Sequence, residues 1–395
     1  MVHILRSRFG RSNYSFPPYS TGSRYQIGRS ALEEAWETTV RVEIEGTYGE
    51  GGGQILRTAI SLSAITGNPV RIVNVRGRRS PPGLRPQHET AVKALAHYVG
   101  ADVRGLMLGS TEVEFFPQSL RPEQIVADTG TAGSTTLILQ SLLPVMLFSG
   151  NRAQVEVRGG TNNPLAPQVD YVERVMIPTL MKMGPKVVLH LQRRGFYPRG
   201  GGILTVQSEP VDTLNPINLT EFGEIKDIDG ITFSSRLPDH IVPRIIKAAQ
   251  LSFEKADIWP YRMEREILQE DSPKCALSPG CGIVLTATSS SGVVLGADGI
   301  GKIKRPAEEV GRVTAENMIH IIGQSVPVDA HLADQLLLYM ALAKGRSTIR
   351  VAEVTQHMLS CIYVCEQFLG PVFTVTNKTG PMITVSCDGV GFSVP

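Results

Sequence analysis

The sequence predicts an α/β (α+β) protein, with a large domain of repeated α/β units and a smaller inserted α/β domain. Three observations lead to this prediction: a strand–turn–helix pattern recurs, the composition is globular, and the pattern changes between about 221 and 326. We expect the large domain at 38–220 and 327–395, and the inserted small domain at 221–326. Residues 1–37 are expected to form a separate N-terminal extension.

The first half of the chain contains three turn-and-helix patterns. The first starts with apolar residues that alternate with polar ones, as in a half-buried strand. In chain order the expected elements are a strand at Val40–Ile44, a turn at Gly46–Gly53 and a helix at Gln54–Ile65; a turn plus helix at Gly130–Leu143; and a strand at Val155–Val157, a turn at Gly159–Pro164 and a helix at Ala166–Met183.

The same pattern returns near the C-terminus, where helix-start residues are easy to recognise. Asp329 is expected to cap a helix at His331–Ala343, with Gly345 as its C-terminal glycine. Ser347–Val351 is expected to form a strand, and Thr355 to cap a helix that runs to about Leu369. Within the insert, Pro306–Ile322 has the pattern of an amphipathic helix. No strict sequence repeat accompanies these units.

Composition excludes several classes of protein. Hydrophobic residues make up 42% and charged residues 19% of the 395, which does not fit a disordered, collagen-like or coiled-coil chain. The apolar stretch near Leu137–Phe148 is too short for a bilayer, so no membrane contact is expected. The five cysteines contain no CxxC pair, which favours a reduced, cytoplasmic protein over a disulfide or zinc scaffold.

The net charge of +2 hides an asymmetry. Residues 1–30 contain five arginines and no acid; without them the chain has 34 basic and 37 acidic residues, a net charge of −3. Bulk charge therefore does not indicate nucleic-acid binding, which would need a local patch. The basic, serine-rich extension resembles an organelle transit peptide, and the alternatives are a disordered tail or an overextended start site.

Two segments have the composition of a phosphate site. The run Gly49–Gln54 lies between a strand and a helix, where glycines let backbone N–H groups approach an anion. Glu50 in this turn suggests a metal ion between the carboxylate and phosphates, although a plain tight turn is the alternative. Arg71–His88 holds five arginines and no acid, and guanidinium groups bind phosphate oxygens in pairs. Its alternative is a solvated basic loop.

Among eight histidines, His331 and His357 differ because each opens a predicted helix directly after a loop. The positive end of a helix disfavours imidazolium by about 0.3–1 kcal/mol, so His357 would be neutral at pH 7 and able to act as a nucleophile. A structural helix-end histidine is the alternative. His97, His190, His240 and His320 fit structural positions.

Five motifs taken together resemble the RNA 3′-terminal phosphate cyclases, over about residues 38–395. They are Glu45–Arg57, Arg76–His88, Gly159–Asn162, Gly195–Gly202 and His331–Gln335. The resemblance implies ATP-dependent conversion of an RNA 3′-phosphate end to a 2′,3′-cyclic phosphate, a ligase reaction that forms a phosphoric-ester bond. It proceeds through a histidine–AMP intermediate and then an RNA-adenylate, with Mg²⁺ or Mn²⁺, and belongs to RNA end processing. A homodimer is also expected.

The resemblance assigns roles to particular residues. His357 matches the adenylylated nucleophile, and Glu50 matches the metal-binding carboxylate. Positions near the RNA terminal phosphate are Arg57, Arg76, Arg79, Gln87 and His88; positions of the nucleotide pocket are Gln140, Pro167, His331, Asp334 and Gln335. His331 stands where some members carry tyrosine, and either ring can pack on adenine.

Two rival functions share this kind of fold. A non-catalytic cyclase-like ribosome-biogenesis factor should lack the nucleophilic histidine and much of the arginine set, yet His357, Arg57 and Arg79 are present. An enolpyruvyl transferase would need no histidine nucleophile. Both are therefore less favoured than the cyclase.

Overall fold

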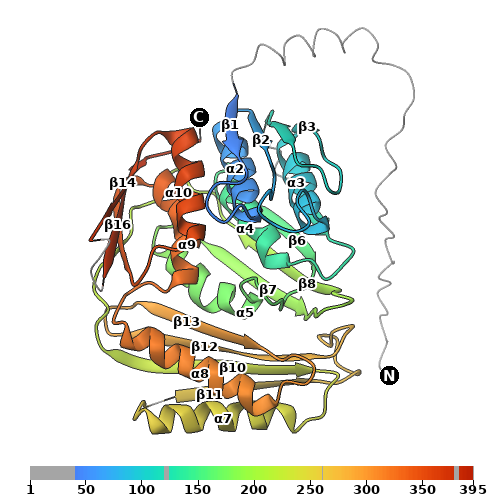
Figure 1. The fold of residues 1–395 in the computed structure, drawn as a ribbon, viewed down its shortest axis with the longest axis vertical. Helices are drawn as coiled ribbons and strands as arrows, with labels where there is room; N and C mark the ends of the chain where they lie inside the picture. The colour runs from blue at the N-terminus through green and yellow to red at the C-terminus, as the bar shows by residue number, and fades with distance from the viewer. Residues whose placement is uncertain (1–40, 120–123, 260, 378–381, 395) are drawn as a thin grey trace, which may run out of the picture. The chain divides into compact units, whose positions relative to one another are not determined.

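The computed structural model describes residues 41–119, 124–259, 261–377 and 382–394. The extension predicted at 1–37 lies outside the described residues. From Arg41 onward the chain forms one compact unit, and its described residues form four four-stranded sheets with helices packed against them (Figure 1). This confirms the predicted α/β fold class.

Three of the four sheets share one topology, which the sequence suggested without a strict repeat. In each, a strand is followed by a helix and a parallel strand, then by a second helix and two antiparallel strands. The sheet orders are β1-β2-β4-β3, β5-β6-β8-β7 and β9-β14-β16-β15. The large body is therefore built from three equivalent α/β units.

The bounds of the three units are as follows. The first contains β1 (Val42–Glu45), α2 (Gly53–Thr66), β2 (Val70–Val73), α3 (Pro86–Val99), β3 (Asp102–Arg104) and β4 (Val113–Phe116). The second contains β5 (Ile125–Asp128), α4 (Thr135–Leu147), β6 (Ala153–Gly159), α5 (Val169–Tyr171), the π-helical turn η1 (Val172–Met176), α6 (Ile177–Met181), β7 (Val187–Arg193) and β8 (Gly202–Ser208). The third contains β9 (Asn218–Leu219), α9 (Ala330–Leu342), β14 (Lys344–Val351), α10 (Gln356–Leu369), β15 (Phe373–Thr376) and β16 (Ile383–Val390).

The fourth sheet interrupts the third unit between β9 and α9. Its elements are β10 (Ile225–Ser235), α7 (Ile241–Lys255), β11 (Tyr261–Leu268), β12 (Gly280–Ser289), β13 (Val294–Ile300) and α8 (Ala307–Gly323). The sheet order is β11-β10-β12-β13, and α7 and α8 pack on each other and on the sheet (Figure 1). The chain segment is the one expected to form the insert; its exact domain boundaries stay a prediction.

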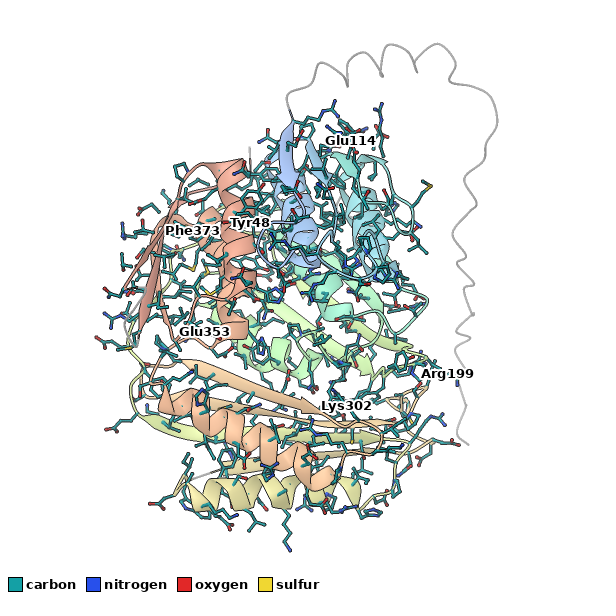
Figure 2. All side chains as sticks on the ribbon, in the orientation of Figure 1. Tyr48, Glu114, Arg199, Lys302, Glu353 and Phe373 are labelled. Atoms are coloured by element: carbon teal, nitrogen blue, oxygen red, sulfur yellow. The ribbon has the colours of Figure 1, made fainter. Side chains whose placement is uncertain are left out.

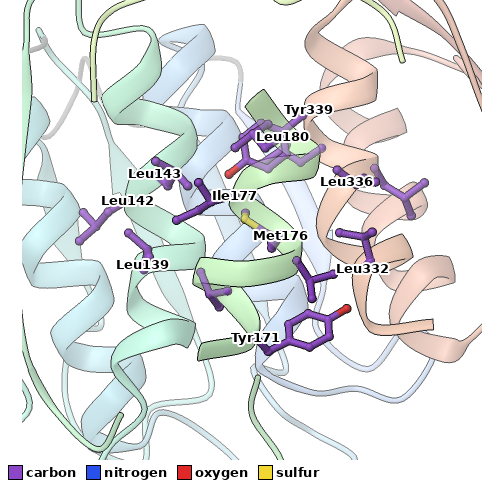
Figure 3. Packing of buried hydrophobic residues seen from close by; sticks show 14 of the residues in the cluster. Leu139, Leu142, Leu143, Tyr171, Met176, Ile177, Leu180, Leu332, Leu336 and Tyr339 are labelled. Atoms are coloured by element: carbon purple, nitrogen blue, oxygen red, sulfur yellow. The ribbon is translucent and has the colours of Figure 1, made fainter. Parts of the chain in front are cut away.

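Apolar helix faces from different units pack together in the core. Figure 3 shows Leu139 and Leu143 of α4 near Ile177 of α6, and Leu332 and Leu336 of α9 on the other side of the same helical segment. All five side chains are buried. Since burying a leucine or isoleucine contributes about 1.5–3 kcal/mol, this packing fixes the helices whose N-terminal ends carry the candidate site.

Both predicted N-caps near the C-terminus are confirmed. The Asp329 carboxylate accepts hydrogen bonds from the backbone N–H groups of His331 and Leu332, each at 3.0 Å. The Thr355 hydroxyl accepts one from Met358 N at 3.1 Å. These bonds satisfy backbone donors that a helix start leaves free, so His331 and His357 occupy the first turns of their helices.

Two local predictions are wrong. Gly345 lies in β14 rather than at a helix end, because the chain passes from α9 straight into a strand that pairs with β16. The helix expected over Ala166–Met183 starts only at Val169 and contains a π-helical turn. Pro167 lies just before the first turn, where no helical hydrogen bond needs its missing N–H. Proline also disfavours the helical conformation for the residue before it, Ala166, so the helix starts after Pro167.

Candidate active site

The glycine-rich turn brings the start of α2 against the start of α3. Gly51 has φ +60°, a left-handed conformation that favours glycine. A β-carbon on Gly53 would lie 2.4 Å from Nε2 of His88, so only glycine allows this approach. The turn is therefore both a tight turn and the means by which two helix starts meet.

Further helix starts join this point. A β-carbon on Gly49 would lie 2.6 Å from Oγ of Ser360, which places α10 against the turn. The backbone N–H of Ser134, the N-cap of α4, donates to Oε1 of Gln87 at 3.2 Å. The N-terminal ends of α2, α3, α4 and α10 thus lie around one region, and their partial positive charges favour an anion there.

His357 lies in this region with a half-exposed ring. Its side chain is 45% exposed, and Nδ1 is 3.2 Å from Oε1 of Glu50. The contact does not have the geometry of a hydrogen bond, which leaves the buried Nδ1 without a partner among the described residues. Burial lowers the pKa of His357; nearby Glu50 opposes this, and Arg57 adds to it. The ring is therefore neutral at pH 7, although burial, rather than the helix end alone, is the largest cause.

Glu50 contacts an arginine as well as the histidine. Nη2 of Arg79 donates to Oε2 of Glu50 at 2.6 Å, and the guanidinium is otherwise half-exposed. The resemblance placed Arg79 near the RNA phosphate and Glu50 at a metal. The structure brings the two side chains together, so one cation and one carboxylate stand beside the same imidazole.

Arg57 is the buried cation of the site. It is 7% exposed; Nη2 donates to Oε1 of Gln54 at 3.0 Å and Nε donates to Oε1 of Gln140 at 3.1 Å. Burial lowers its pKa to about 10, and the nearby carboxylates of Asp334 and Glu50 oppose that shift. Arg57 therefore remains charged at pH 7, and two amides hold its guanidinium in place.

The other residues assigned to the RNA phosphate have structural partners too. Nη1 of Arg76 donates to the carbonyls of Pro81 at 3.0 Å and Gly83 at 2.9 Å, so this arginine braces its own loop. His88 is buried, and its Nδ1 accepts a hydrogen bond from Arg85 N at 3.2 Å. Burial, with three nearby arginines, lowers the pKa of His88 to about 3, so its ring is neutral and its proton lies on Nε2.

A small cavity joins α2, α4, α9 and α10. Three of the five predicted nucleotide residues line it: Gln140, Asp334 and Gln335. Pro167 and His331 do not. The Pro167 carbonyl accepts from Thr136 Oγ1 at 2.7 Å, and the His331 ring meets Tyr171 edge-on, with ring centres 6.2 Å apart. The predicted pocket is thus brought together only in part.

Sequence reasoning missed several residues that line this cavity. They are Gln54, Thr58, Leu338, Tyr339 and Cys361. Gln54 directly follows the glycine run, and Cys361 is four residues after His357 on α10. Helical spacing places such pairs on one face, and this signal could have identified Cys361.

Comparison with protein families settles the relationship. The model of the family described as RNA 3′-terminal phosphate cyclase matches residues 48–375, which include the glycine turn and His357. The chain belongs to this family.

Individual cyclase-family relatives agree over most of their length. An RNA 3′-terminal phosphate cyclase of Pyrobaculum aerophilum is 43% identical over 352 residues, 89% of this chain and 99% of the relative. One of Pyrococcus abyssi is 42% identical over 339 residues, 86% of this chain and 96% of the relative. The similarity therefore extends through all three repeated units and the fourth sheet.

Within this cyclase-family site, Asp334 has an unusual carboxyl group. Burial raises its pKa to about 8 from 3.8; Arg57 opposes the shift, and Asp329 and Glu50 add to it. The folded protein therefore keeps this proton through a range in which the unfolded chain has lost it. By linkage, the contribution of Asp334 to the free energy of unfolding falls as pH rises from about 4 to about 8.

Replacing Asp334 with asparagine should remove that loss. We expect Asp334→Asn to raise the free energy of unfolding relative to wild type more at pH 8 than at pH 5. Urea unfolding followed by circular dichroism at both pH values measures the difference, with Asp388→Asn on the exposed face of β16 as the control. An equal effect of Asp334→Asn at the two pH values would contradict the raised pKa.

No helix within the described ranges combines the length and apolar character needed to cross a bilayer.

Proposed function

We propose that the chain is an ATP-dependent RNA 3′-terminal phosphate cyclase that converts an RNA 3′-phosphate to a 2′,3′-cyclic phosphate. The observation that supports this most directly is the neutral, half-exposed imidazole of His357, 3.2 Å from Glu50 and close to the meeting point of four helix starts. A nucleophile in that position can attack a phosphate that the site has already bound.

In the first step His357 attacks the α-phosphorus of ATP. The Glu50 carboxylate beside Nδ1 favours the proton on that nitrogen, which leaves the lone pair on Nε2. A bond forms between Nε2 and the α-phosphorus, the bond to the bridging oxygen breaks, and pyrophosphate leaves. The ring is then cationic until Nδ1 loses its proton. Positioning and charge stabilisation supply most of the rate enhancement.

In the second step an oxygen of the RNA 3′-phosphate attacks the phosphorus of AMP on His357. The N–P bond breaks and RNA-adenylate forms. The neighbouring 2′-OH then attacks the terminal phosphorus, loses its proton and expels AMP, which closes the cyclic phosphate. We propose that Arg57, Arg76, Arg79, Gln87 and His88 bind the phosphate oxygens, His88 through the proton on Nε2. Gln140, Pro167, His331, Asp334 and Gln335 would bind the nucleotide.

Glu50 fits a divalent metal ion, Mg²⁺ or Mn²⁺. No group of three or more metal-binding side chains occurs in the part of the chain that the structure describes. A single carboxylate still fits magnesium, which commonly binds one or two carboxylates together with substrate phosphates and water. When bound, the ion would neutralise phosphate charge.

We also propose that the protein is cytoplasmic and acts as a homodimer. The proposed chemistry requires neither this location nor this oligomeric state.

Labelled ATP tests the proposed function. With a divalent metal and ATP labelled at the α-phosphate, the protein should become labelled through an acid-labile bond, and label at the γ-phosphate should not transfer. Adding RNA with a 3′-phosphate should release labelled AMP and give a cyclic end. Absence of both protein label and cyclic product would favour the non-catalytic alternative.

Glu50 should affect metal use selectively. We expect Glu50→Gln to raise the metal concentration that gives half-maximal adenylylation by at least about tenfold, because the amide lacks the charge that holds a cation. The measurement is a metal titration of protein labelling at saturating ATP. Glu316→Gln, an exposed carboxylate of α8, is the control. An unchanged titration in Glu50→Gln would remove this residue from the metal site.

A further inference from the structure

One motif of the family has no part in the proposed chemistry. Residues Gly195–Gly201 connect β7 to β8, and the turn closes through Gly200 N, which donates to the Phe196 carbonyl at 2.8 Å. Phe196 is buried against Phe233, with ring centres 6.1 Å apart. The next side chain, Tyr197, is 76% exposed. A rigidly anchored turn therefore presents an aromatic ring to solvent.

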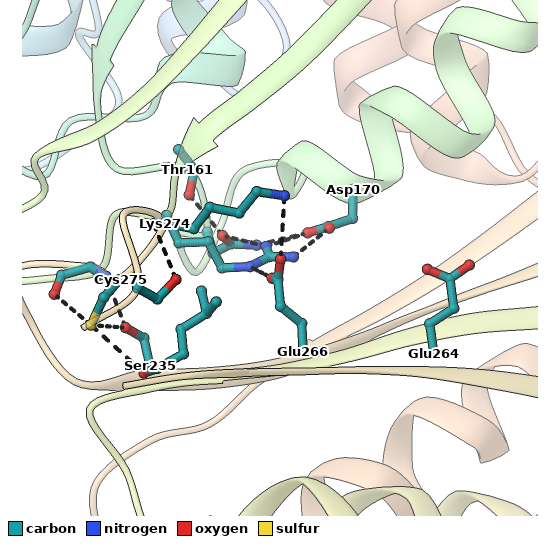
Figure 4. A network of polar contacts seen from close by, with 12 residues as sticks. Thr161, Asp170, Ser235, Glu264, Glu266, Lys274 and Cys275 are labelled. Carbon is teal, nitrogen blue, oxygen red and sulfur yellow. Dashed lines mark hydrogen bonds and ion pairs between the residues drawn. The ribbon is translucent and has the colours of Figure 1, made fainter. Parts of the chain in front are cut away.

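The base of this turn is fixed by a buried charged network. The Arg194 guanidinium donates two hydrogen bonds to Asp170, each at 2.8 Å, and a third to Glu266. It also lies over the Phe233 ring, 3.9 Å from the ring centre. Figure 4 shows Asp170 and Glu266 meeting in this network, near Lys274. Because the network ties the second unit to the fourth sheet, the turn has little freedom to move.

The turn lies beside the proposed phosphate site. A β-carbon on Gly200 would lie 2.3 Å from the Thr131 carbonyl oxygen, so the turn packs on the loop that precedes α4. In the same loop, a β-carbon on Gly133 would lie 3.2 Å from Cβ of Gln87, and Ser134 N donates to Gln87. A continuous set of contacts therefore connects Tyr197's turn with Gln87.

Exposed cations lie on this turn and on a loop at the same end of the fourth sheet. Arg199 is exposed, and so are Lys302 and Lys304 in the loop after β13; none of the three has an ion-pair partner within the described ranges. This loop starts at the same end of the fourth sheet as the turn, since Gly301 N donates to the Cys281 carbonyl and Gly280 packs on Phe196. Figure 2 labels Arg199 and Lys302, both in the lower part of the view. Neither 195–202 nor 301–305 contains an acid.

We infer that this surface binds the single-stranded RNA that lies 5′ of the last two nucleotides of the 3′-phosphorylated end. Tyr197 would stack on an unpaired base, and Arg199, Lys302 and Lys304 would bind backbone phosphates. Exposed aromatic rings interspersed with cations are the usual means of holding single-stranded nucleic acid without sequence preference. The inference rests on the proposed function, because Gln87 marks the terminal phosphate only if that function is correct.

A comparison of RNA lengths tests the surface. The full chain would be assayed with a 3′-phosphorylated decamer and a 3′-phosphorylated dinucleotide. Tyr197→Ala and Arg199→Ala should each raise the KM for the decamer by at least about fivefold, the loss expected for one stacked base or phosphate contact. The KM for the dinucleotide should change by less than about twofold, and adenylylation by labelled ATP should be unchanged.

Two control variants match these changes. Arg152→Ala removes an exposed cation at the start of β6, and Leu108→Ala removes an exposed apolar side chain near the arginine-rich loop. Neither should alter the decamer KM. Equal decamer KM values for wild type, Tyr197→Ala and Arg199→Ala would overturn the inference. An effect of Leu108→Ala alone would also overturn it, because the RNA would then lie near Leu108 rather than near Tyr197.

Photocrosslinking gives a direct, activity-independent readout. A decamer with 5-iodouridine at the third nucleotide from its 3′ end should crosslink to the peptide that contains Tyr197, and Tyr197→Phe should retain the crosslink. Crosslinks confined to other peptides would overturn the inference even if the protein is active. Failure of wild type to form the AMP adduct would instead overturn the proposed function, and the crosslink would still report where RNA binds.

Discussion

The variant His357→Ala should lose protein adenylylation and RNA cyclisation by at least about 1,000-fold, as expected when a covalent nucleophile is removed. His88 cannot replace it, because His88 is buried and neutral, with its proton on the nitrogen that faces Gly53. The measurement is transfer of α-labelled phosphate from ATP to protein, together with cyclisation of a 3′-phosphorylated RNA.

The fold should survive this substitution. The His357 side chain is half-exposed and its Nδ1 has no hydrogen-bond partner among the described residues, so alanine leaves no buried group newly unpaired. Circular dichroism and the melting temperature should match wild type within about 2 °C. His320→Ala, at the exposed end of α8, is the matched control and should keep full labelling. Label retained in His357→Ala would move the nucleophile to another residue.

Arg57→Ala should have the second largest effect. We expect cyclisation to fall about 100- to 1,000-fold, the usual loss when one preorganised group that stabilises phosphate or oxyanion charge is removed. Unlike His357, Arg57 is also structural, because its guanidinium satisfies the side-chain oxygens of Gln54 and Gln140. Leaving these two acceptors unpaired should lower the free energy of unfolding by about 1–3 kcal/mol for each acceptor that water cannot reach.

Arg57→Lys separates the two roles. Lysine keeps the charge but cannot donate to both amides with a planar fork, so activity should recover in part and stability should recover less. Single-turnover cyclisation and urea unfolding measure the two quantities on the same variants. Full activity in Arg57→Lys would show that charge alone is needed, and full activity in Arg57→Ala would exclude Arg57 from the phosphate site.

Local sequence signals predicted most of the helices and the N-caps of two of them. Asp329 and Thr355 are predicted as N-caps because each precedes an apolar periodic run and has a side-chain oxygen that can accept from the first-turn N–H groups. Both side chains accept such bonds in the structure. The prediction that Gly345 ends a helix is wrong, because glycine occurs both at helix ends and in strands. Only the pairing of β14 with β16 determines that Gly345 lies in a strand. The π-helical turn at Val172–Met176 leaves no pattern in a single sequence.

The candidate site divides in the same way. Residue type and order predicted Glu50, the arginine segment and His357 as chemically important. The contacts between them could not be predicted. The Glu50–Arg79 ion pair and the hydrogen bond from Arg57 to Gln140 join residues from different turns or helices, and the bonds from Arg76 to its own loop depend on how that loop folds. Such contacts depend on how helix ends meet, which packing of distant apolar faces determines.

Sequence alone therefore determined the fold class, the family resemblance and the identity of the groups able to do phosphoryl chemistry, because each follows from short-range periodicity or residue type. Tertiary structure alone decided that four helix starts meet, that His357 is neutral chiefly through burial, and that Tyr197 stands exposed beside the loop that contacts Gln87. The physical reason is range: propensity and capping act within one turn of chain, whereas burial, electrostatic shifts and surface juxtaposition arise only after remote segments have packed.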